Sequence, residues 1–297
     1  MAWRRDFRYA SPMPELPEVE TVRRGLEPAL VGRRLTKVTL RRPDLRFPFP
    51  PHFARRLTGA RVAELRRRGK FLLAPLSSGE TLIVHLGMTG RFLIDLAQAA
   101  DDVPFRDQCP PPRHAHVVFE TDNGPRVTFS DARRFGFMDV FETANLSHHL
   151  QLANLGPEPF DGAFNQSYLA AAFSARRRGV KDILMDQSVV AGLGNIYASE
   201  ALHRARVAPG KEARRIGRKA IGRIVPAIRA VLEEAIDAGG STLRDFAAAN
   251  GSPGYFQHSF RVYGRGGEPC PNPGCVGRIH RSIQAGRATY HCPTCQE

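Results

Sequence analysis

Short apolar runs, rich in β-branched and aromatic residues, recur through the first half of the chain. Turn sequences such as Ser77-Ser78-Gly79 and Asp122-Asn123-Gly124-Pro125 separate them. Because no helical pattern intervenes, these runs predict a β-sandwich or a barrel. The expected strands are Leu35–Leu40, Arg61–Leu65, Phe71–Leu76, Thr81–Leu86, Arg91–Asp95, Ala115–Glu120, Arg126–Ser130 and Phe137–Glu142.

Helical spacing of apolar residues occurs before this region and again after it. Before it, a helix is expected from Pro17, which suits a first turn, to Gly32. Glu18 and Glu20 favour the positive end of the dipole of that helix. The later helices are expected at Asn165–Ala175, Val180–Ser188, Asn195–His203, Gly217–Ala238 and Leu243–Ala249, with Pro226 kinking the fourth or starting a new segment of it.

The pattern divides the chain into unequal parts. Residues 1–12 have no periodicity and are interpreted as a disordered extension or a misassigned start. Residues 13–145 are β-rich, residues 146–262 are helical, and residues 263–297 form a separate small module. A chain of 297 residues is long enough for two domains with their own cores. The expected fold class is α+β with several domains: an N-terminal β-sandwich with flanking helices, followed by a helical domain.

The charge of the chain is strongly positive and unevenly distributed. The net charge is +14 and the pI about 10.3, which indicates a polyanionic partner. Residues 1–70 hold 18 basic and 7 acidic residues (+11), residues 71–175 hold 6 and 12 (−6), and residues 176–223 hold 12 and 4 (+8). Two basic regions separated by an acidic one indicate a cleft that grips its partner from two sides, although an Arg-rich genomic composition accounts for part of the excess.

No apolar run approaches the ~20 residues of a membrane span, and the first residues carry charge without the apolar region of a signal peptide. A cytoplasmic, reducing location is therefore expected, and the five cysteines are interpreted first as thiols or metal ligands. Cys109 lies in a Pro-rich loop from Ala99 to Pro112, has no evident partner and is interpreted as a free thiol.

Four cysteines near the C-terminus have the spacing of a metal site. Four residues separate Cys270 from Cys275, two separate Cys292 from Cys295, and 16 lie between the pairs. Two close pairs at Pro- or Gly-rich turns can close a tetrahedral zinc site. Two disulfides are the alternative, which a reducing compartment disfavours. One structural zinc ion would supply the folding free energy of a module of only ~35 residues.

The segment between the two cysteine pairs is expected to form a hairpin. Its strands are predicted at Arg278–Ser282 and Arg287–His291, with Gln284 to Arg287 at the tip. In so basic a protein Arg287 is either a phosphate contact or a solvated surface residue.

The stretch from Met13 to Glu20 carries the strongest candidate chemistry. If the functional chain begins at Pro14, this residue has a free secondary amine. An α-amino group titrates at roughly 7.7–8.0, against about 10.4 for a lysine, so far more of it is unprotonated at neutral pH. Such amines attack electrophilic carbon and form Schiff bases. Taken alone, the stretch fits a proline-flanked helix start equally well.

Several further motifs, together with this stretch and the four cysteines, resemble the formamidopyrimidine-DNA glycosylase family of bacterial enzymes that excise oxidised purines. The resemblance covers residues 13–297. It implies a β-sandwich, a helix–two-turns–helix domain and a zinc finger, and a monomeric bifunctional glycosylase and AP lyase that acts on double-stranded DNA containing oxidised bases or abasic sites. The motifs are Pro14–Glu20, Arg68–Leu73, His85–Met88, Asp131–Gly136, Leu155–Pro159, Gly192–Glu200, Tyr263–Arg265 and Arg287–Cys295.

The resemblance implies roles for single residues in the chemistry. Pro14 is the nucleophile that attacks C1′ of a flipped-out nucleotide, and Glu15 is the proton donor that opens the sugar ring. Lys70 is the proton donor in β-elimination. Arg287 is matched to δ-elimination, and we interpret it mainly as a phosphate clamp. Glu18 either assists the chemistry or stabilises the helix dipole.

The resemblance also implies the DNA contacts. Met88 and Phe135 are wedges that fill the void left by the flipped base, and Arg133 bonds to the orphaned partner base. Without the resemblance, Met88 and Phe135 would be interpreted as core residues. The segment Gly192–Asn195 leads into a helix and suits a phosphate. The remaining implied contacts are His114, Arg176 (within Arg176–Arg178), Asn195, and the lesion-sensing loop Asn250–Phe256.

Two other functions remain open from the sequence. One is the related endonuclease-VIII branch, which acts on oxidised pyrimidines, although Leu16 and the long loop before Tyr263 favour the purine branch. The other is a non-catalytic binder of damaged DNA, which the complete set of catalytic candidates disfavours. A chain that retains residues 1–12 has an amide nitrogen at Pro14 and no nucleophile there, so the active form is expected to begin at Pro14.

Overall fold

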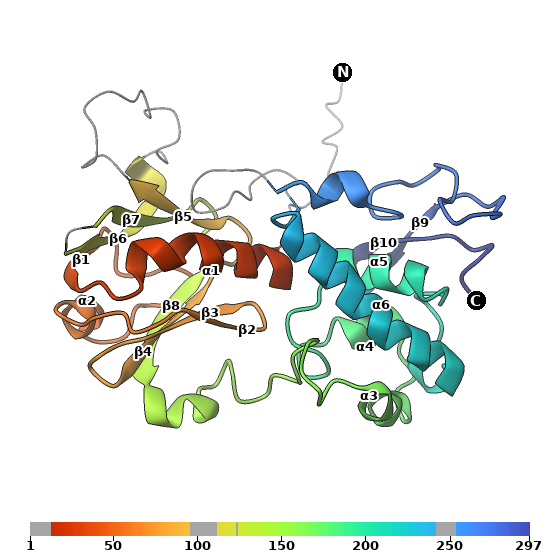
Figure 1. Ribbon diagram of the computed structural model, residues 1–297, viewed down its shortest axis with the longest axis horizontal. Helices are drawn as coiled ribbons and strands as arrows, with labels where there is room; N and C mark the ends of the chain where they lie inside the picture. The colour runs from red at the N-terminus through yellow and green to blue at the C-terminus, as the bar shows by residue number, and fades with distance from the viewer. Residues whose placement is uncertain (1–12, 96–111, 123, 242–253) are drawn as a thin grey trace, which may run out of the picture.

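The computed structural model describes residues 13–95, 112–122, 124–241 and 254–297. They form two lobes side by side, one made of strands and one mainly of helices (Figure 1). The expectations for residues 1–12, Cys109, Leu243–Ala249 and most of the loop Asn250–Phe256 lie outside the described residues.

The strand lobe is a sandwich of two four-stranded antiparallel sheets, as the sequence predicts. In strand β3, Leu72 and Ala74 face the core between the sheets, whereas Phe71 and Leu73 pack on the other face against Leu146. The sheets have the orders β1 (Leu35–Leu40), β6 (Ala115–Thr121), β7 (Arg126–Asp131), β5 (Gly90–Asp95) and β2 (Arg66–Arg68), β3 (Phe71–Pro75), β4 (Glu80–His85), β8 (Phe137–Glu142).

The predicted strand Arg61–Leu65 is not a strand in the structure. Its backbone makes isolated bridges at Arg61 and Val62, and the edge strand is instead Arg66–Arg68. Val62 and Leu65 nevertheless face the core. Apolar spacing therefore identified the buried side chains correctly but could not distinguish an anchored loop from a strand.

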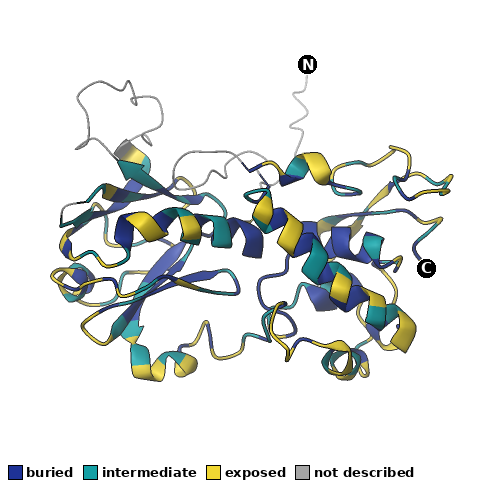
Figure 2. Ribbon diagram, in the orientation of Figure 1, coloured by how far each residue is buried: buried dark blue, intermediate teal, exposed yellow. Residues whose placement is uncertain are grey.

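Helix α1 (Leu16–Leu30) joins the two lobes. Leu16 packs into the core of the helical lobe, whereas Val19 and Leu26 belong to the sandwich core. The first turn of α1 is consequently buried where the lobes meet (Figure 2). A second short helix, α2 (Phe53–Leu57), was not predicted and covers the same sandwich core.

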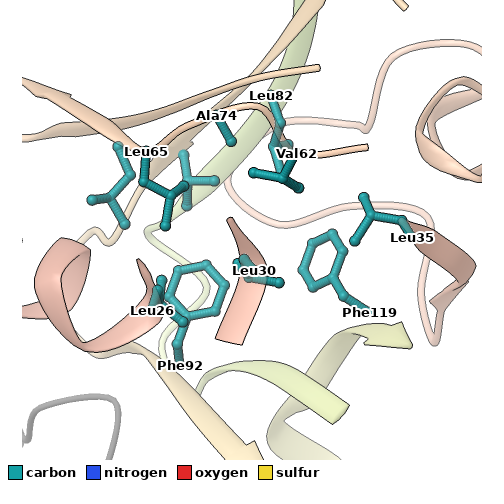
Figure 3. Close-up of a pocket in the computed structure, with 11 residues that line it drawn as sticks. Leu26, Leu30, Leu35, Val62, Leu65, Ala74, Leu82, Phe92 and Phe119 are labelled. Carbon is teal, nitrogen blue, oxygen red and sulfur yellow. The ribbon is translucent and has the colours of Figure 1, made fainter. Parts of the chain in front are cut away.

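A small cavity of about 20 Å³ lies inside the sandwich core (Figure 3). Leu26 and Leu30 of α1 line it together with Phe92 and Phe119 of one sheet and aliphatic side chains of the other. Because every lining side chain is apolar, a water molecule there would find no hydrogen-bond partner. We interpret the cavity as a packing defect and not as a ligand site.

The helices of the second lobe match the predicted ranges to within a few residues. Helix α6 runs through Pro226 as a single element, so the predicted restart does not occur. Pro226 is exposed, while Ile224 and Ile228 are buried on the opposite side of the helix. Because proline has no backbone N–H, one helical hydrogen bond is missing, but only on the exposed side. Within the described ranges, no helix combines the length and apolar character needed to cross a bilayer. The elements are α3 (Gln166–Phe173), α4 (Val180–Leu184), α5 (Asn195–Arg204), α6 (Arg218–Asp237) and the 3₁₀ helices η2 (Pro112–His114), η3 (Thr143–His148), η4 (Ala213–Arg215) and η5 (Phe256–Ser259).

The predicted C-terminal hairpin consists of β9 (His280–Gln284) and β10 (Arg287–His291). Ala285 and Gly286 connect the strands with φ of 46° and 75°, as a two-residue type I′ turn requires. Arg287 pairs with Gln284 and His291 pairs with His280, so β9 begins and ends two residues later than predicted. Strand β10 packs against α5, so the hairpin is fixed to the helical lobe.

Candidate active site

Glu15 lies buried between the two lobes, immediately before α1 and next to the buried Pro14. Its carboxylate accepts hydrogen bonds from the backbone N–H groups of Ile196 at 2.9 Å and Tyr197 at 3.4 Å. These two residues belong to the first turn of α5. The start of α1 is therefore fastened to the positive end of a helix from the other lobe.

Two glycines make this close approach possible. A Cβ at Gly194 would lie 2.3 Å from Glu15 Cδ, and one at Gly192, whose φ is +88°, would lie 2.8 Å from the Leu16 side chain. The N–H of Leu16 also donates to the Gly192 carbonyl at 3.0 Å. The sequence predicted a phosphate at the helix start that follows Gly192–Asn195. In the structure, backbone N–H groups of this helix start bind the Glu15 carboxylate.

The pKa of the Glu15 carboxyl group lies near neutral pH. Burial raises the pKa of Glu15 to about 7, against the opposing positive charge of Lys70. The negative charge of Glu18 raises it further, and the two backbone N–H groups of α5 lower it. A carboxyl group with this pKa can either donate or accept a proton at neutral pH.

Glu18 is also buried, and it binds four donors. Its carboxylate accepts from the Glu15 N–H at 2.9 Å, from the Tyr197 hydroxyl at 2.5 Å, and from the N–H and hydroxyl of Ser241, both at 2.8 Å. The first of these bonds completes a capping box at the start of α1. Of the two roles expected for Glu18, the contacts support the one at the helix start.

Lys70 follows the turn between β2 and β3 and is half-buried. Burial lowers the pKa of Lys70, the negative charges of Glu15 and Glu18 act against this effect, and the positive charge of Arg287 adds to it. The structure thus brings Glu15, Lys70 and Arg287, predicted from widely separated motifs, close enough to influence one another electrostatically.

Glu158, in the segment that connects the two lobes, binds the turn that contains Gly69 and Lys70. Glu158 Oε1 accepts from the Gly69 N–H at 2.6 Å and from Arg68 at 3.1 Å. Its other oxygen lies 2.7 Å from Arg67. The Leu155–Pro159 motif therefore fixes the position of Lys70.

Lys181, on α4, is a further charged residue near this site that sequence reasoning missed. Its side chain is completely buried, and its ammonium group donates to Thr289 Oγ1 at 2.7 Å. Burial lowers the pKa of Lys181 to about 8. The negative charges of Asp182 and Glu15 oppose this shift, and the positive charge of Arg287 adds to it. A lysine within a short helical pattern carries no local signal of such burial, because its partner comes from β10.

Met88 and Phe135 are not core residues. Phe135 is 42% exposed, and Met88 is half-buried. The guanidinium of Arg133 lies over the Phe135 ring at 4.8 Å from its centroid. The three residues predicted to fill the void in DNA occupy two loops in direct contact, since a Cβ at Gly87 would lie 2.3 Å from the Phe135 carbonyl carbon.

The remaining predicted DNA contacts lie in different surroundings. His114 is half-buried at the end of η2, and Arg176 pairs with Asp186 at 3.4 Å. The Asn195 side-chain amide donates to the Ala288 carbonyl at 3.0 Å, while its buried oxygen has no hydrogen-bond partner among the described residues. Asn195 therefore links α5 to the hairpin.

The four C-terminal cysteines converge as predicted. Their sulfur atoms all lie within 4.8 Å of one another; those of Cys275 and Cys292 are 3.6 Å apart and those of Cys270 and Cys295 are 3.7 Å apart. A disulfide needs about 2.05 Å, whereas a tetrahedral ion at about 2.3 Å from each sulfur separates the sulfurs by about 3.8 Å. The cysteines are free thiols in a geometry that fits a four-thiolate metal site.

Comparison with known proteins agrees with these features. The sequence model of the formamidopyrimidine-DNA glycosylase N-terminal domain matches residues 13–138, and the model of its H2TH domain matches residues 155–247. A formamidopyrimidine-DNA glycosylase of Cereibacter sphaeroides is 56% identical over 284 residues, covering 96% of this chain and all of that protein.

Solved structures give the same result. A Lactococcus lactis FPG mutant in complex with Fapy-dG containing DNA has a TM-score of 0.84 and 31% identity, and the match covers 96% of this chain and 100% of that one. A complex of Lactococcus lactis Fpg with abasic site containing DNA has the same TM-score and identity over 95% and 99% of the chains. This chain is therefore a member of the formamidopyrimidine-DNA glycosylase family.

Proposed function

We propose that this protein is a DNA glycosylase of base excision repair that removes oxidised purines, such as 8-oxoguanine and formamidopyrimidines, from double-stranded DNA and then cleaves the strand as an AP lyase. The observation that carries the proposal is the buried Glu15 carboxyl group, with a pKa of about 7, beside Pro14 and facing the charge of Lys70. The complexes of relatives with Fapy-dG and abasic DNA support the choice of substrate.

The first chemical step belongs to Pro14. In its unprotonated form, the Pro14 nitrogen of a chain that begins there attacks C1′ of the flipped nucleotide while the bond from C1′ to the damaged base breaks, and the proton that this nitrogen then loses passes to the displaced base. Protonated Glu15 donates its proton to the ring oxygen of the sugar, so that the ring opens and a cationic Schiff base forms between Pro14 and C1′. The displaced base leaves after taking up a proton.

The Schiff base then serves as an electron sink for elimination. Loss of a proton from C2′ expels the 3′ phosphate (β-elimination) and leaves a double bond conjugated with the Schiff base. Loss of a proton from C4′ then expels the 5′ phosphate (δ-elimination). Burial lowers the pKa of Lys70, so its ammonium group is a stronger acid than that of an exposed lysine and can serve as the proton donor. Arg287 stays charged and stabilises the departing phosphate.

The DNA would be held from both lobes. Met88 and Phe135 enter the void left by the flipped base, and Arg133 bonds to the partner base. The two basic regions of the sequence, residues 1–70 and 176–223, belong to different lobes for most of their length. This distribution suits a DNA duplex bound across the junction of the lobes. The proposed phosphate contacts are His114, Asn195 and one arginine of Arg176–Arg178, for which we take Arg176.

One zinc ion, held by Cys270, Cys275, Cys292 and Cys295, is the proposed cofactor. A closed four-thiolate site leaves no open position for substrate, so the ion would supply folding free energy and no chemistry. Its effect on the reaction would come through β10, which carries Arg287 into the site.

The proposal divides the chain into three functional parts. We assign residues 13–145 to the catalytic sandwich, 146–262 to the helix–two-turns–helix domain and 263–297 to the zinc finger. Residues 1–13 must be absent from the active form, because the Pro14 nitrogen is an amine only when no residue precedes it.

Borohydride trapping tests the proposal. Protein beginning at Pro14 is mixed with duplexes that carry either oxidised guanine or an oxidised pyrimidine, and the Schiff base is reduced to a stable adduct. We expect a covalent adduct with the oxidised-guanine duplex, and none from the same protein with Met13 retained. Preference for the pyrimidine duplex would assign the protein to the endonuclease-VIII branch. Tight binding without any adduct would make it a non-catalytic binder.

A further inference from the structure

Asp131, the last residue of β7, is completely buried although it carries a carboxylate. One oxygen accepts a hydrogen bond from the Thr89 hydroxyl and lies 3.3 Å from the N–H of Arg133. The other oxygen accepts from the N–H of Gly136 at 2.8 Å. Thr89 Oγ1 in turn accepts from the Arg133 N–H at 3.0 Å, so the four residues form one closed network.

The donors in this network come from the two loops that carry the proposed wedge. Thr89 directly follows Met88, and Gly136 directly follows Phe135, while Arg133 itself donates through its backbone. Asp131 therefore binds the side chain of the residue after Met88, the backbone of Arg133 and the backbone of the residue after Phe135. Its own buried side chain cannot reach the DNA.

The two loops also pack without space between their backbones. A Cβ at Gly87, whose φ is +63°, would lie 2.3 Å from the N atom of Gly136. The N–H of Gly87 donates to His85 Nδ1 at 3.0 Å, which fixes the turn before Met88. With contact this close, one loop cannot shift unless the other shifts too.

We propose that Asp131 is a positioning residue that locks these two loops into a single rigid wedge. The inference rests on the proposed function, because it takes Met88, Arg133 and Phe135 as the residues that fill the void. A wedge ordered before DNA binding avoids the entropy cost of ordering three side chains when the nucleotide flips. Asp131 therefore acts on the flipping of the nucleotide and has no part in the reaction at C1′.

The test compares a substrate that needs the wedge with one that does not. An abasic site in a duplex leaves a partner base to be supported, whereas the same site in a single strand has no partner and no stack to replace. In Asp131→Asn, an amide group faces the N–H and hydroxyl donors, and one acceptor is lost. We expect the rate of borohydride trapping to fall at least tenfold on the duplex and less than twofold on the single strand.

A second readout follows the wedge directly. 2-Aminopurine opposite the abasic site changes its fluorescence when its stacking changes, and we expect this signal on binding of wild-type protein and its loss in Asp131→Asn. Asp122→Asn is the matched control, because Asp122 Oδ1 also accepts a backbone N–H, from Arg34 at 2.7 Å, but far from the wedge. We expect it to leave both trapping rates within twofold of the wild type.

Parallel losses on both substrates would make Asp131 a residue that only maintains the fold, and unchanged duplex trapping would also overturn the proposal. If Asp131→Asn does not fold by circular dichroism, Thr89→Val decides the question, because it removes one donor and keeps the shape of the side chain. It should lower duplex trapping selectively but by less. Failure of the wild type to trap on either substrate would instead reject the proposed function.

Discussion

The Glu15 carboxylate accepts the Ile196 N–H at 2.9 Å, although 181 residues separate the two in the chain. This bond joins the residue beside the proposed nucleophile to the first turn of α5. It also means that the helix dipole, the burial and the neighbouring charges all act on one carboxyl group.

Replacing Glu15 by Gln should separate the two proposed activities. The amide cannot protonate the sugar ring, so we expect base excision to slow by about 10²–10⁴-fold, the usual contribution of general acid catalysis. Abasic sugars open without an enzyme, so trapping on a preformed abasic site should fall by much less. Single-turnover rates on the two duplexes provide the measurement. Equal losses on both would reject the assigned role of Glu15.

The stability of the protein should depend on pH through Glu15. Because its pKa is raised from 4.5 to about 7 on folding, its stabilising contribution is complete below about pH 4.5 and is lost as the pH rises through 7. The difference corresponds to about 3 kcal/mol. The free energy of unfolding of wild type, relative to Glu15→Gln, should therefore decrease by about this amount between pH 4.5 and 8. Urea unfolding at several pH values measures it, and a constant difference would contradict the raised pKa.

Gly194→Ala should impair the reaction without unfolding the protein. The new Cβ would meet Glu15 Cδ at 2.3 Å, so the carboxylate must move away from α5. We expect base excision to fall at least tenfold. Gly210→Ala is the matched control, because nothing lies within 4 Å of its Cβ position, and it should retain full activity. Thermal unfolding shows whether both variants remain folded.

Lys70→Gln should slow elimination more than Schiff-base formation. The ammonium group that serves the departing phosphate is lost, whereas the Pro14 amine is untouched. We therefore expect the ratio of trapped adduct to cleaved strand to rise at least tenfold on abasic duplex. Gel separation of adduct and cleaved product gives this ratio. A fall of both species together would assign Lys70 to an earlier step.

Purified protein should contain one zinc ion per chain by atomic absorption. Cys292→Ser should lose the metal and expose residues 263–297 to proteolysis, because the hairpin has little core of its own. Since β10 carries Arg287, strand cleavage should fall as well. Cys109→Ser is the control and should retain its zinc. Retention of structure and zinc by Cys292→Ser would contradict the four-thiolate site.

Local patterns were sufficient wherever a residue's neighbours in sequence are also its packing partners. Strands such as β1 and β8 have the bounds predicted from their apolar runs. The cysteine spacing likewise predicted the cluster, since each pair closes within one turn. The same reasoning failed at Arg61–Leu65, where burial was correct but the pairing partner lies elsewhere.

The sequence by itself determined the sandwich, the helices, the four-cysteine cluster and, through its motifs, the candidate residues of the site. Only the tertiary structure decided how these residues affect one another. The pKa of Glu15 is raised by its burial between the lobes, and Lys181 is buried against β10. Asp131 binds donors from a loop 42 residues earlier. In each case the partner comes from a distant part of the chain, and the strength of the effect depends on burial that no local pattern encodes.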